Sequence, residues 1–188
     1  MPDDLIKIIA AVRSEEEFRQ ALKTPVGSIF LLYGSLFKLA SMVKAAKSHG
    51  KKFFVHIDLV EGLGRDAVGI QYLSRIGTDG IISTRGNLLN IAKELGLKTV
   101  QRVFILDSRS IESALESIHS VKPDMVEVMP GLLPKVITRF CDRVDMPVIA
   151  GGLIESKEEV DSAIKAGASY ISTTRPYLWD YEGNPDSD

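Results

Sequence analysis

Short apolar stretches rich in β-branched residues alternate along the chain with segments whose apolar residues recur every three or four positions. The first pattern is typical of strands buried on both faces of a parallel sheet, and the second of amphipathic helices. Eight strands are expected, with a helix between each strand and the next. The expected strands are Ile6–Val12, Val26–Leu32, Phe53–Leu59, Gly80–Thr84, Thr99–Leu106, Met125–Met129, a strand beginning at Pro147, and Tyr170–Thr173.

This alternation predicts an α/β fold with a parallel sheet, and eight strands favour a closed (β/α)8 barrel of the TIM type over an open doubly wound sheet. The chain has 188 residues, which is short for such a barrel, so its loops should be short. After the last strand we expect one helical turn around Leu178-Trp179, so that the final helix is short or missing. We therefore predict a single TIM-like barrel domain over residues 1–180 and a disordered tail over residues 181–188.

Two turns near the end of the chain predict a phosphate site. The strand that begins at Pro147 runs into Gly151-Gly152, and Ser156 and Glu159 then have the spacing of a capping box at a helix start. Glycine lets the backbone approach a ligand closely, and N–H groups beside a helix N-terminus favour an anion. The turn Ser172-Thr-Thr-Arg175 follows the eighth strand. In TIM barrels, the loops after strands seven and eight together form a phosphate site.

The composition is that of an ordinary globular protein, with 45% hydrophobic and 26% charged residues. No apolar run is long enough for a membrane helix, and the N-terminus lacks the pattern of a signal peptide. The single Cys141 fits a reducing compartment, so we expect a cytoplasmic protein without membrane partners. The net charge of −2 gives no bulk attraction to nucleic acid.

Charged residues lie in or just after several of the strands, where this fold has its functional rim. They are Arg13, Asp58, Glu61, Arg65, Arg85, Arg102, Glu127 and Arg175. One alternative is that they pair with one another in buried ion pairs. However, several arginines beside a diglycine turn favour an anionic ligand, and carboxylates can accept hydrogen bonds from its hydroxyl groups. A small phosphorylated polyol fits this mixture.

His56 and Asp58 are two residues apart in one expected strand, so both side chains should point into the barrel if Ile57 faces the helices. With Glu127 they could hold a divalent metal, which is a weak signal. His56 could instead be a general base, or a core histidine bonded to Asp58. No lysine follows a strand, which disfavours Schiff-base chemistry, because Lys52 and Lys98 precede their strands.

Two basic clusters could contact RNA phosphates, although a solvated outer face is the more common role of such a cluster. Lys135, Arg139 and Arg143 recur every four residues on the expected sixth helix. The second cluster is Lys44, Lys47, Lys51 and Lys52.

Five stretches together resemble the glycerol-3-phosphate-responsive antiterminator family, and the likeness extends from Ile8 to Trp179. They are Phe54-Val-His-Ile-Asp-Leu59, Ile82-Ser-Thr-Arg-Gly-Asn87, Gln101-Arg-Val-Phe-Ile-Leu-Asp-Ser108, Glu127-Val-Met-Pro-Gly131 and Val148-Ile-Ala-Gly-Gly-Leu-Ile-Glu155. The resemblance implies a barrel-shaped, non-catalytic regulator of glycerol-uptake genes. It would bind glycerol 3-phosphate as effector and act on a leader mRNA to cause transcription antitermination.

The residues themselves support the phosphorylated ligand better than the RNA. The alternative is a phosphate-sugar enzyme on the same barrel, an isomerase, epimerase or phosphodiesterase, with Asp58 and Glu127 as its acid–base pair. No cofactor or metal is expected, and a homo-oligomer is left open. The predicted ligand-binding residues are Arg13, His56, Asp58, Glu61, Arg65, Arg85, Gln101, Arg102, Glu127, Gly131, Gly151, Gly152, Thr173 and Thr174. The predicted RNA-binding residues are Lys135, Arg139 and Arg143.

Overall fold

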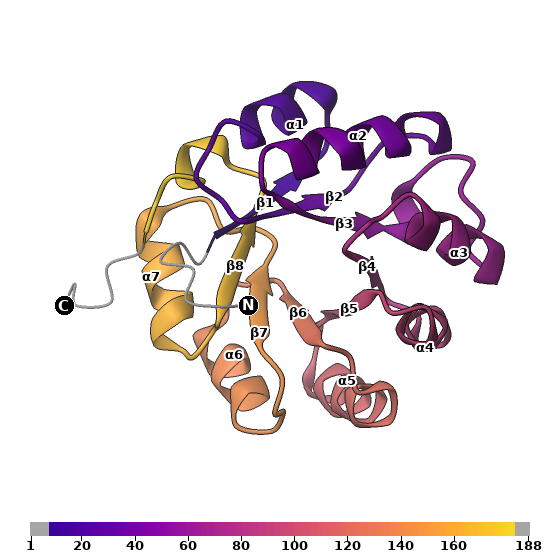
Figure 1. The fold of residues 1–188 in the computed structure, drawn as a ribbon. Helices are drawn as coiled ribbons and strands as arrows, with labels where there is room; N and C mark the ends of the chain where they lie inside the picture. The colour runs from indigo at the N-terminus through magenta and orange to yellow at the C-terminus, as the bar shows by residue number, and fades with distance from the viewer. Residues whose placement is uncertain (1–7, 183–188) are drawn as a thin grey trace.

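The computed structural model describes residues 8–182, and in this range the eight strands close into a parallel barrel surrounded by helices (Figure 1). The strands are β1 (Ile8–Val12), β2 (Ser28–Leu31), β3 (Lys52–His56), β4 (Gly80–Ser83), β5 (Lys98–Phe104), β6 (Met125–Met129), β7 (Val148–Gly151) and β8 (Tyr170–Thr173). The helices are α1 (Glu15–Ala21), α2 (Leu36–Ser48), α3 (Ala67–Arg75), α4 (Gly86–Glu94), α5 (Ser108–Val121), α6 (Pro134–Cys141) and α7 (Lys157–Lys165). Two 3₁₀ turns are η1 (Ile57–Leu59) and η2 (Pro176–Leu178).

Each strand pairs with its neighbours in sequence, and β8 returns to pair with β1, with Ile8 opposite Ile171. The predicted TIM-like barrel is therefore confirmed. No α-helix follows β8 within the described residues, and the chain ends its last connection with the short turn η2. Trp179 is fully buried after this turn, and its indole N–H donates to the Thr173 carbonyl at 3.0 Å. The buried Trp179 side chain thus packs against the barrel after β8, where a TIM barrel usually has its eighth helix.

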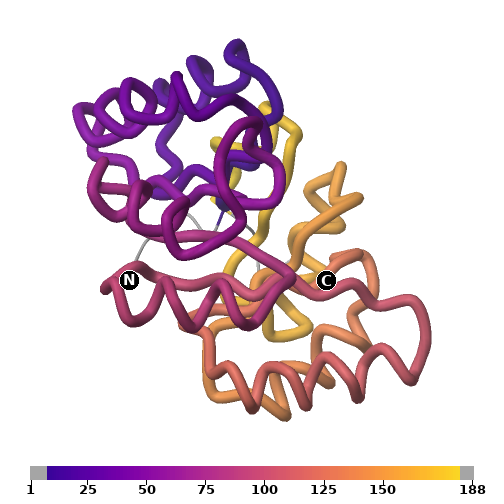
Figure 2. Tube along the Cα trace, turned by 90° about the vertical axis from the view of Figure 1, so that its right-hand side faces the viewer, coloured from indigo at the N-terminus to yellow at the C-terminus, as the bar shows by residue number. Residues whose placement is uncertain are grey.

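Alternation along the strands separates two apolar layers. Residues such as Phe53 and Val55 point outward and pack beneath the helices. Phe54 points inward and meets Phe30 edge-on, with ring centroids 5.4 Å apart. The inner layer fills the barrel, so that open space remains only at its two ends. Figure 2 shows the barrel from the side, with the strands running from one end to the other.

Three predicted strands have wrong boundaries, and the second begins at Ser28 rather than at Val26. The third strand ends at His56, because Ile57–Leu59 turns into η1, and Asp58 is therefore not a strand residue. The fifth strand is Lys98–Phe104 and stops before Leu106, which is exposed. Ile6 and residues 183–188 of the predicted tail lie outside the described residues. Tyr181, which was assigned to that tail, donates its hydroxyl to Asp161 on α7 at 2.8 Å.

No helix within residues 8–182 has both the length and the apolar character that are needed to cross a bilayer.

Candidate functional site

A cavity of about 210 Å³ opens at the C-terminal end of the barrel, between strand residues of β1, β5, β6 and β8 and the segments that follow β1, β2, β7 and β8. The barrel rules place functional sites of this fold at the same end. The lining residues are Ala11, Arg13, Leu32, Arg102, Glu127, Met129, Gly152, Leu153, Ile154, Glu155, Ser172, Thr173, Thr174 and Arg175. Most come from the two loops in which the sequence indicates a phosphate site.

A buried ion pair forms the floor of the cavity. Arg102 Nε donates to Glu127 Oε2 at 2.7 Å, and the side chains are 7% and 1% exposed. Gly151 makes room for the carboxylate, since a Cβ there would lie 2.6 Å from Glu127 Oε1. The two terminal nitrogens of Arg102 donate no hydrogen bond within residues 8–182. The guanidinium is thus held by one edge, and its remaining donors are available to an anion.

The turn after β7 brings backbone amides to the cavity wall. Gly152 and Leu153 both adopt positive φ, +75° and +63°, in the left-handed region. Their N–H groups make no hydrogen bond to any part of the chain that the structure describes. The predicted capping box follows, with Ser156 accepting from the Glu159 N–H and fixing the start of α7. Bare amides before a helix start suit a negatively charged group.

The β8 side adds hydroxyl groups. The Ser172 side chain points inward from β8, is 3% exposed and has no hydrogen-bond partner among the described residues. Thr173 is occupied by the fold, because its hydroxyl donates to the Ile154 carbonyl at 2.9 Å and accepts from the Arg175 N–H. Arg175 forms an ion pair with Glu155 across the mouth. Ser172 therefore offers a free hydroxyl next to the arginine floor, and Thr174 offers another in the cavity lining.

The structure brings together part of the predicted ligand set. Six of its members line the cavity: Arg13, Arg102, Glu127, Gly152, Thr173 and Thr174. Gly131 and Gly151 do not line the cavity themselves, but each contacts a residue that does. Gly151 gives space to Glu127, while the Gly131 N–H donates to the Gly152 carbonyl at 3.1 Å.

The prediction that Gln101 faces the ligand is wrong. Val100 and Arg102 point inward from β5, so Gln101 between them points outward. Its amide donates to the Ser117 hydroxyl of α5 at 2.7 Å. Gln101 therefore joins β5 to a helix and contributes nothing to the cavity.

A second polar cluster lies above β3 and β4, apart from the cavity lining. Asp58 accepts from the Ser83 hydroxyl at 2.8 Å, and its other oxygen is 3.4 Å from Arg85 Nε without hydrogen-bond geometry. Arg65 donates to the Asp58 carbonyl at 2.8 Å. Glu61 is exposed in the same loop. Of these four predicted ligand residues, Asp58 and Arg85 approach each other as a partly exposed ion pair, Arg65 binds a backbone carbonyl, and the Glu61 side chain has no partner among the described residues.

His56 is buried inside the barrel and neutral. Burial, and then the positive charge of Arg102, lower its pKa to about 4. The 3.8 Å separation between His56 Nδ1 and Asp58 Oδ2 is too long for a hydrogen bond, and a neutral imidazole forms no ion pair there. Within residues 8–182, no three His, Cys, Asp or Glu side chains are arranged to hold a metal ion. The structure therefore favours a core histidine over the metal ligand and over the general base.

Sequence reasoning omitted Leu153, Glu155, Ser172 and Arg175 from the ligand set, although all four line the cavity. Ser172 could have been found from the alternation of side chains along β8, because it lies two residues after the inward-facing Tyr170. The positive φ of Leu153 has no sequence signal, since left-handed backbone is uncommon for leucine.

The predicted RNA stripe does not form on one helix. Helix α6 ends at Cys141, so Arg143 lies beyond it. Arg139 and Arg143 both form ion pairs with Glu112 of α5. Their charges are therefore partly neutralised within the fold, and only Lys135 of this set keeps an unpaired charge among the described residues.

Comparison with known proteins places the chain in a family. A protein of Escherichia coli (strain K12), described as uncharacterized protein YgcP, is 36% identical over 173 residues, which cover 92% of this chain and 91% of that protein. The glycerol uptake operon antiterminator regulatory protein from Listeria monocytogenes has a crystal structure that matches with a TM-score of 0.91 and 35% identity, over 96% of this chain and 98% of that one.

A glycerol uptake operon antiterminator-related protein from Thermotoga maritima matches with a TM-score of 0.83 and 35% identity, over 93% of this chain and 98% of that one. The family model described as glycerol-3-phosphate responsive antiterminator matches residues 8–179, which is almost the whole described barrel. The chain therefore belongs to the glycerol-3-phosphate responsive antiterminator family.

Proposed function

We propose that this protein is a cytoplasmic regulator of glycerol-uptake genes that binds glycerol 3-phosphate and acts on a leader mRNA to prevent transcription termination. Membership of the family supports the regulatory role. The cavity at the C-terminal end of the barrel supports the effector, because its donors suit a small phosphorylated polyol.

The observation that carries the proposal is the half-satisfied guanidinium of Arg102. Glu127 fixes one edge of the group and leaves the terminal nitrogens beside the cavity. The free amides of Gly152 and Leu153 supply further donors to the phosphate, and Ser172 can bond a hydroxyl group. Charge-assisted hydrogen bonds of this kind are about twice as strong as neutral ones.

The size of the cavity supports a small effector. Its volume of about 210 Å³ lies below the ~300–1,000 Å³ of drug-sized pockets. Bound glycerol 3-phosphate would then be surrounded by protein on most sides, with its phosphate towards the β7 and β8 loops.

The rival enzyme reading finds less support. The proposed acid–base pair of Asp58 and Glu127 is not assembled, since Glu127 lines the cavity and Asp58 bonds Ser83 outside that lining. Glu127 is also held in an ion pair with Arg102, which disfavours a proton-transfer role. No lysine lies among the described cavity residues, so Schiff-base formation has no candidate nucleophile there.

Transcription in vitro tests the proposal. The template would carry the leader and terminator upstream of the glycerol-uptake genes of the source organism. We expect read-through to rise only when wild-type protein and glycerol 3-phosphate are both present. Arg102→Lys keeps a charge beside Glu127 but loses the fork of donors, so it should need at least about tenfold more effector. Arg65→Lys, outside the cavity lining, should behave as wild type.

The enzyme reading is tested on the same samples. Incubation with glycerol 3-phosphate or pentose phosphates, followed by NMR, should show no turnover. Read-through that ignores glycerol 3-phosphate would contradict the sensor. Product formation that Glu127→Gln abolishes would establish the enzyme instead.

A further inference from the structure

The N-terminal end of the barrel, opposite the effector cavity, is strongly basic. We consider the last turn of each helix, the connection after it and the first residue of the next strand. Their basic residues within the described range are Arg19, Lys23, Lys47, Lys51, Lys52, Arg75, Lys93, Lys98, Lys122, Arg139, Arg143 and Lys165. Their acidic residues within the same range are Asp79, Glu94, Asp124, Asp142 and Asp145. This excess stands in a chain whose net charge is −2.

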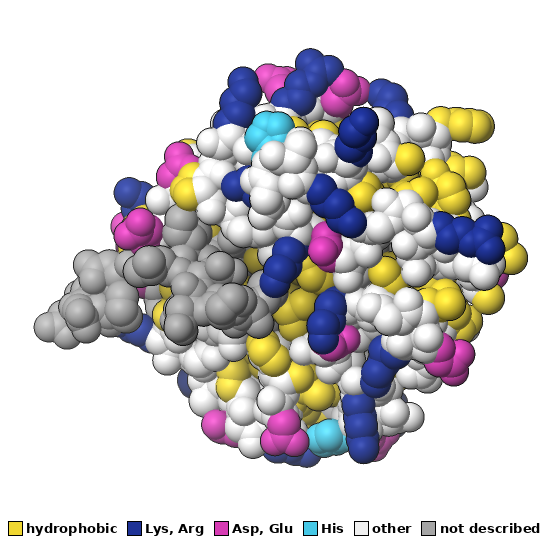
Figure 3. Space-filling model, viewed as in Figure 1, with side chains coloured by type: hydrophobic (Ala, Val, Ile, Leu, Met, Phe, Trp, Pro, Cys, Tyr) yellow, Lys and Arg dark blue, Asp and Glu magenta, His cyan; other side chains and the backbone are white. Residues whose placement is uncertain are grey.

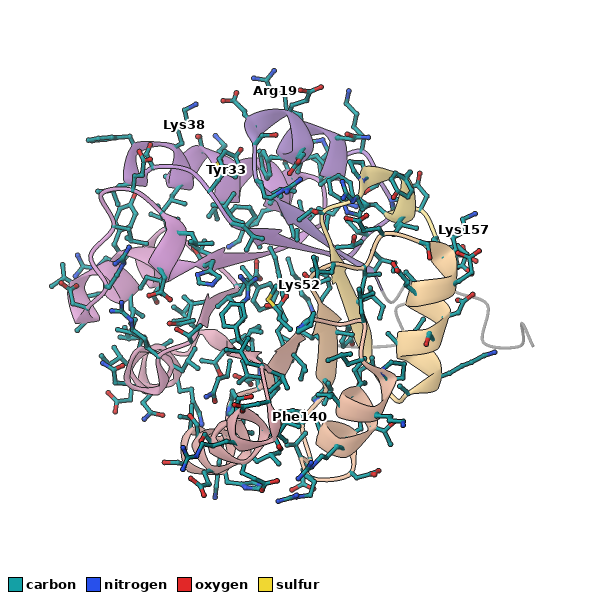
Figure 4. All side chains as sticks on the ribbon, turned by 180° about the vertical axis from the view of Figure 1, so that it is seen from behind. Arg19, Tyr33, Lys38, Lys52, Phe140 and Lys157 are labelled. Carbon is teal, nitrogen blue, oxygen red and sulfur yellow. The ribbon has the colours of Figure 1, made fainter. Side chains whose placement is uncertain are left out.

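Figure 3 looks onto this end of the molecule. Basic side chains form a band across the middle of the face and surround exposed hydrophobic side chains near the barrel axis. Figure 4, seen from behind, places Lys52 near the middle of the barrel. Basic side chains thus lie both near the middle of this end and over the ends of the surrounding helices.

Part of this charge serves the fold. Helix dipoles favour cations at helix C-termini. Lys51 donates to the Val26 carbonyl at 2.8 Å, Lys93 donates to the Lys122 carbonyl at 2.7 Å, and Lys98 pairs with Asp124 at 2.6 Å. These three ammonium groups bind backbone carbonyls or a carboxylate near the ends of helices and strands, so a structural role accounts for them.

The ammonium groups of Lys47, Lys52 and Lys122 have no such role. None of them makes a hydrogen bond or ion pair within residues 8–182, and all three are exposed. Lys52 is the first residue of β3, and Lys122 follows α5 in a left-handed conformation with φ +50°. Lys23 and Arg75 are likewise exposed without a partner in the described range, so at least five cations of this end have no structural role.

A hollow of about 370 Å³ opens in the middle of this end. Its lining residues are Lys52, Phe54, Asp79, Lys98, Asp124, Met125, Pro147 and Tyr170. It is deepened by Gly80 at the inward position of β4, where a Cβ would lie 2.7 Å from the Phe54 ring. Both acids are engaged by the fold, since Asp79 accepts from the Phe53 N–H at 2.8 Å and Asp124 pairs with Lys98.

We infer that the N-terminal end of the barrel is the RNA-binding face of this protein. The unpaired Lys52 lines a hollow that also has apolar and aromatic walls, and further unpaired cations lie on the same end of the barrel. This combination suits single-stranded RNA, with phosphates on the cations and an unstacked base against the apolar wall. The inference rests on the proposed function, because that function supplies the RNA. It moves the contact away from α6, where Arg139 and Arg143 share Glu112, and places effector and RNA at opposite ends.

Two matched triple variants test the inference. The first, Lys47→Gln, Lys52→Gln and Lys122→Gln, removes three of the unpaired cations of the N-terminal end. The second, Lys38→Gln, Lys135→Gln and Lys157→Gln, removes the same charge from the C-terminal end, including α6. Binding of the leader RNA is followed by fluorescence anisotropy at several salt concentrations with saturating glycerol 3-phosphate. Calorimetry with glycerol 3-phosphate checks that each variant is folded.

The first triple should bind RNA at least about tenfold more weakly, and its log–log salt dependence should fall by roughly 2, at ~0.7 for each lost phosphate contact. The second triple should bind as wild type. Equal binding by the first triple, or a larger loss in the second, would overturn the inference and leave the proposed function intact. A wild-type dimer that the first triple dissociates with unchanged RNA affinity would assign the face to self-association. Wild-type protein that fails to bind the leader RNA at all would defeat the proposed function itself.

Discussion

The two ends of the barrel use charged side chains in different ways. At the C-terminal end, Arg102 and Glu127 are buried together, and the cavity above them is enclosed by loops. At the N-terminal end, the comparable pair of Lys98 and Asp124 is exposed by 65% and 28%. The difference teaches that one end encloses its charged side chains around a small cavity, whereas the other presents charge over a broad surface.

Helix direction adds to this contrast. Every helix starts near the C-terminal end of the strands and finishes near the N-terminal end, so the helix dipoles favour cations at the N-terminal end. Helix α1 begins with three glutamates, and α7 begins with Glu158 and Glu159. In our proposal, Arg102 and the backbone amides hold the effector at short range, whereas RNA phosphates meet the unpaired cations of the opposite end.

The sharpest test of this comparison replaces the cation of each ion pair, Arg102–Glu127 at one end and Lys98–Asp124 at the other. Arg102→Met leaves Glu127 charged, buried and unpaired, and we expect it to lower the free energy of unfolding by about 3–5 kcal/mol. Lys98→Met leaves Asp124 near solvent and still bonded to Thr99, so its effect should stay below about 1 kcal/mol. Urea unfolding at neutral pH measures both. Equal losses would mean that the two ends do not differ in dielectric environment.

The pH dependence of stability distinguishes the ends next. His56 lies beneath the cavity with a pKa near 4, and in the unfolded chain it titrates near ~6.5. A lowered histidine pKa means that the fold prefers the neutral ring. Its contribution is therefore complete above pH ~6.5 and is lost as the pH falls towards 4, to an extent of about 3 kcal/mol.

His56→Gln should remove this part of the acid destabilisation between pH 6.5 and 4. His49→Gln, at the exposed end of α2, serves as the control and should keep the wild-type slope. Unfolding curves at a series of pH values provide the measurement. An unchanged slope in the His56 variant would show that the ring is not held neutral by its surroundings.

Effector affinity separates the ends in a third way. Arg102→Lys should weaken glycerol 3-phosphate binding about tenfold, or ~1.4 kcal/mol, because an ammonium cannot replace the planar fork. Lys52→Gln removes a charge at the opposite end, and should leave the effector affinity within twofold of wild type. Isothermal calorimetry resolves such a difference. A comparable loss in Lys52→Gln would indicate that long-range charge, rather than local geometry, holds the effector.

A matched pair of glycines gives the smallest expected effect. Gly152 and Gly96 both have φ +75°, one at the cavity and the other after α4. Alanine at either position should lower the stability by about 1 kcal/mol through backbone strain. Gly152→Ala would also place a Cβ 2.5 Å from Met129 Cε, whereas nothing lies within 4 Å at Gly96. Only Gly152→Ala should therefore weaken effector binding, by several-fold in calorimetry, and an equal effect of Gly96→Ala would contradict this account.

Periodicity in the sequence was enough to predict the barrel, because buried parallel strands and amphipathic helices leave strong patterns. It also predicted the glycine turn after β7 and the helix start behind it, because the capping pair of Ser156 and Glu159 is a local signal. The sequence could not predict which face of the barrel a residue takes once the strand before it has ended in a turn. Asp58 left the barrel interior because η1 broke the alternation, and Gln101 was assigned to the wrong face although Arg102 beside it was assigned correctly.

Pairing across the rim was equally inaccessible to the sequence. Whether Arg85 meets Asp58 or a ligand depends on loop conformations that place residues from different strands together. The same holds for Arg139 and Arg143, which meet Glu112 from another helix. The unpaired lysines of the N-terminal end became visible only after the partners of their neighbours were known.

Calorimetry of the wild-type protein with glycerol 3-phosphate, glycerol and inorganic phosphate tests the central claim most directly, namely that the C-terminal cavity recognises a phosphate and a polyol together. We predict one site per chain for glycerol 3-phosphate, with an affinity at least about a hundredfold higher than for either fragment, since the charge-assisted and hydroxyl contacts are made at the same time. Equal affinities for glycerol 3-phosphate and inorganic phosphate, or no binding of either, would contradict the claim.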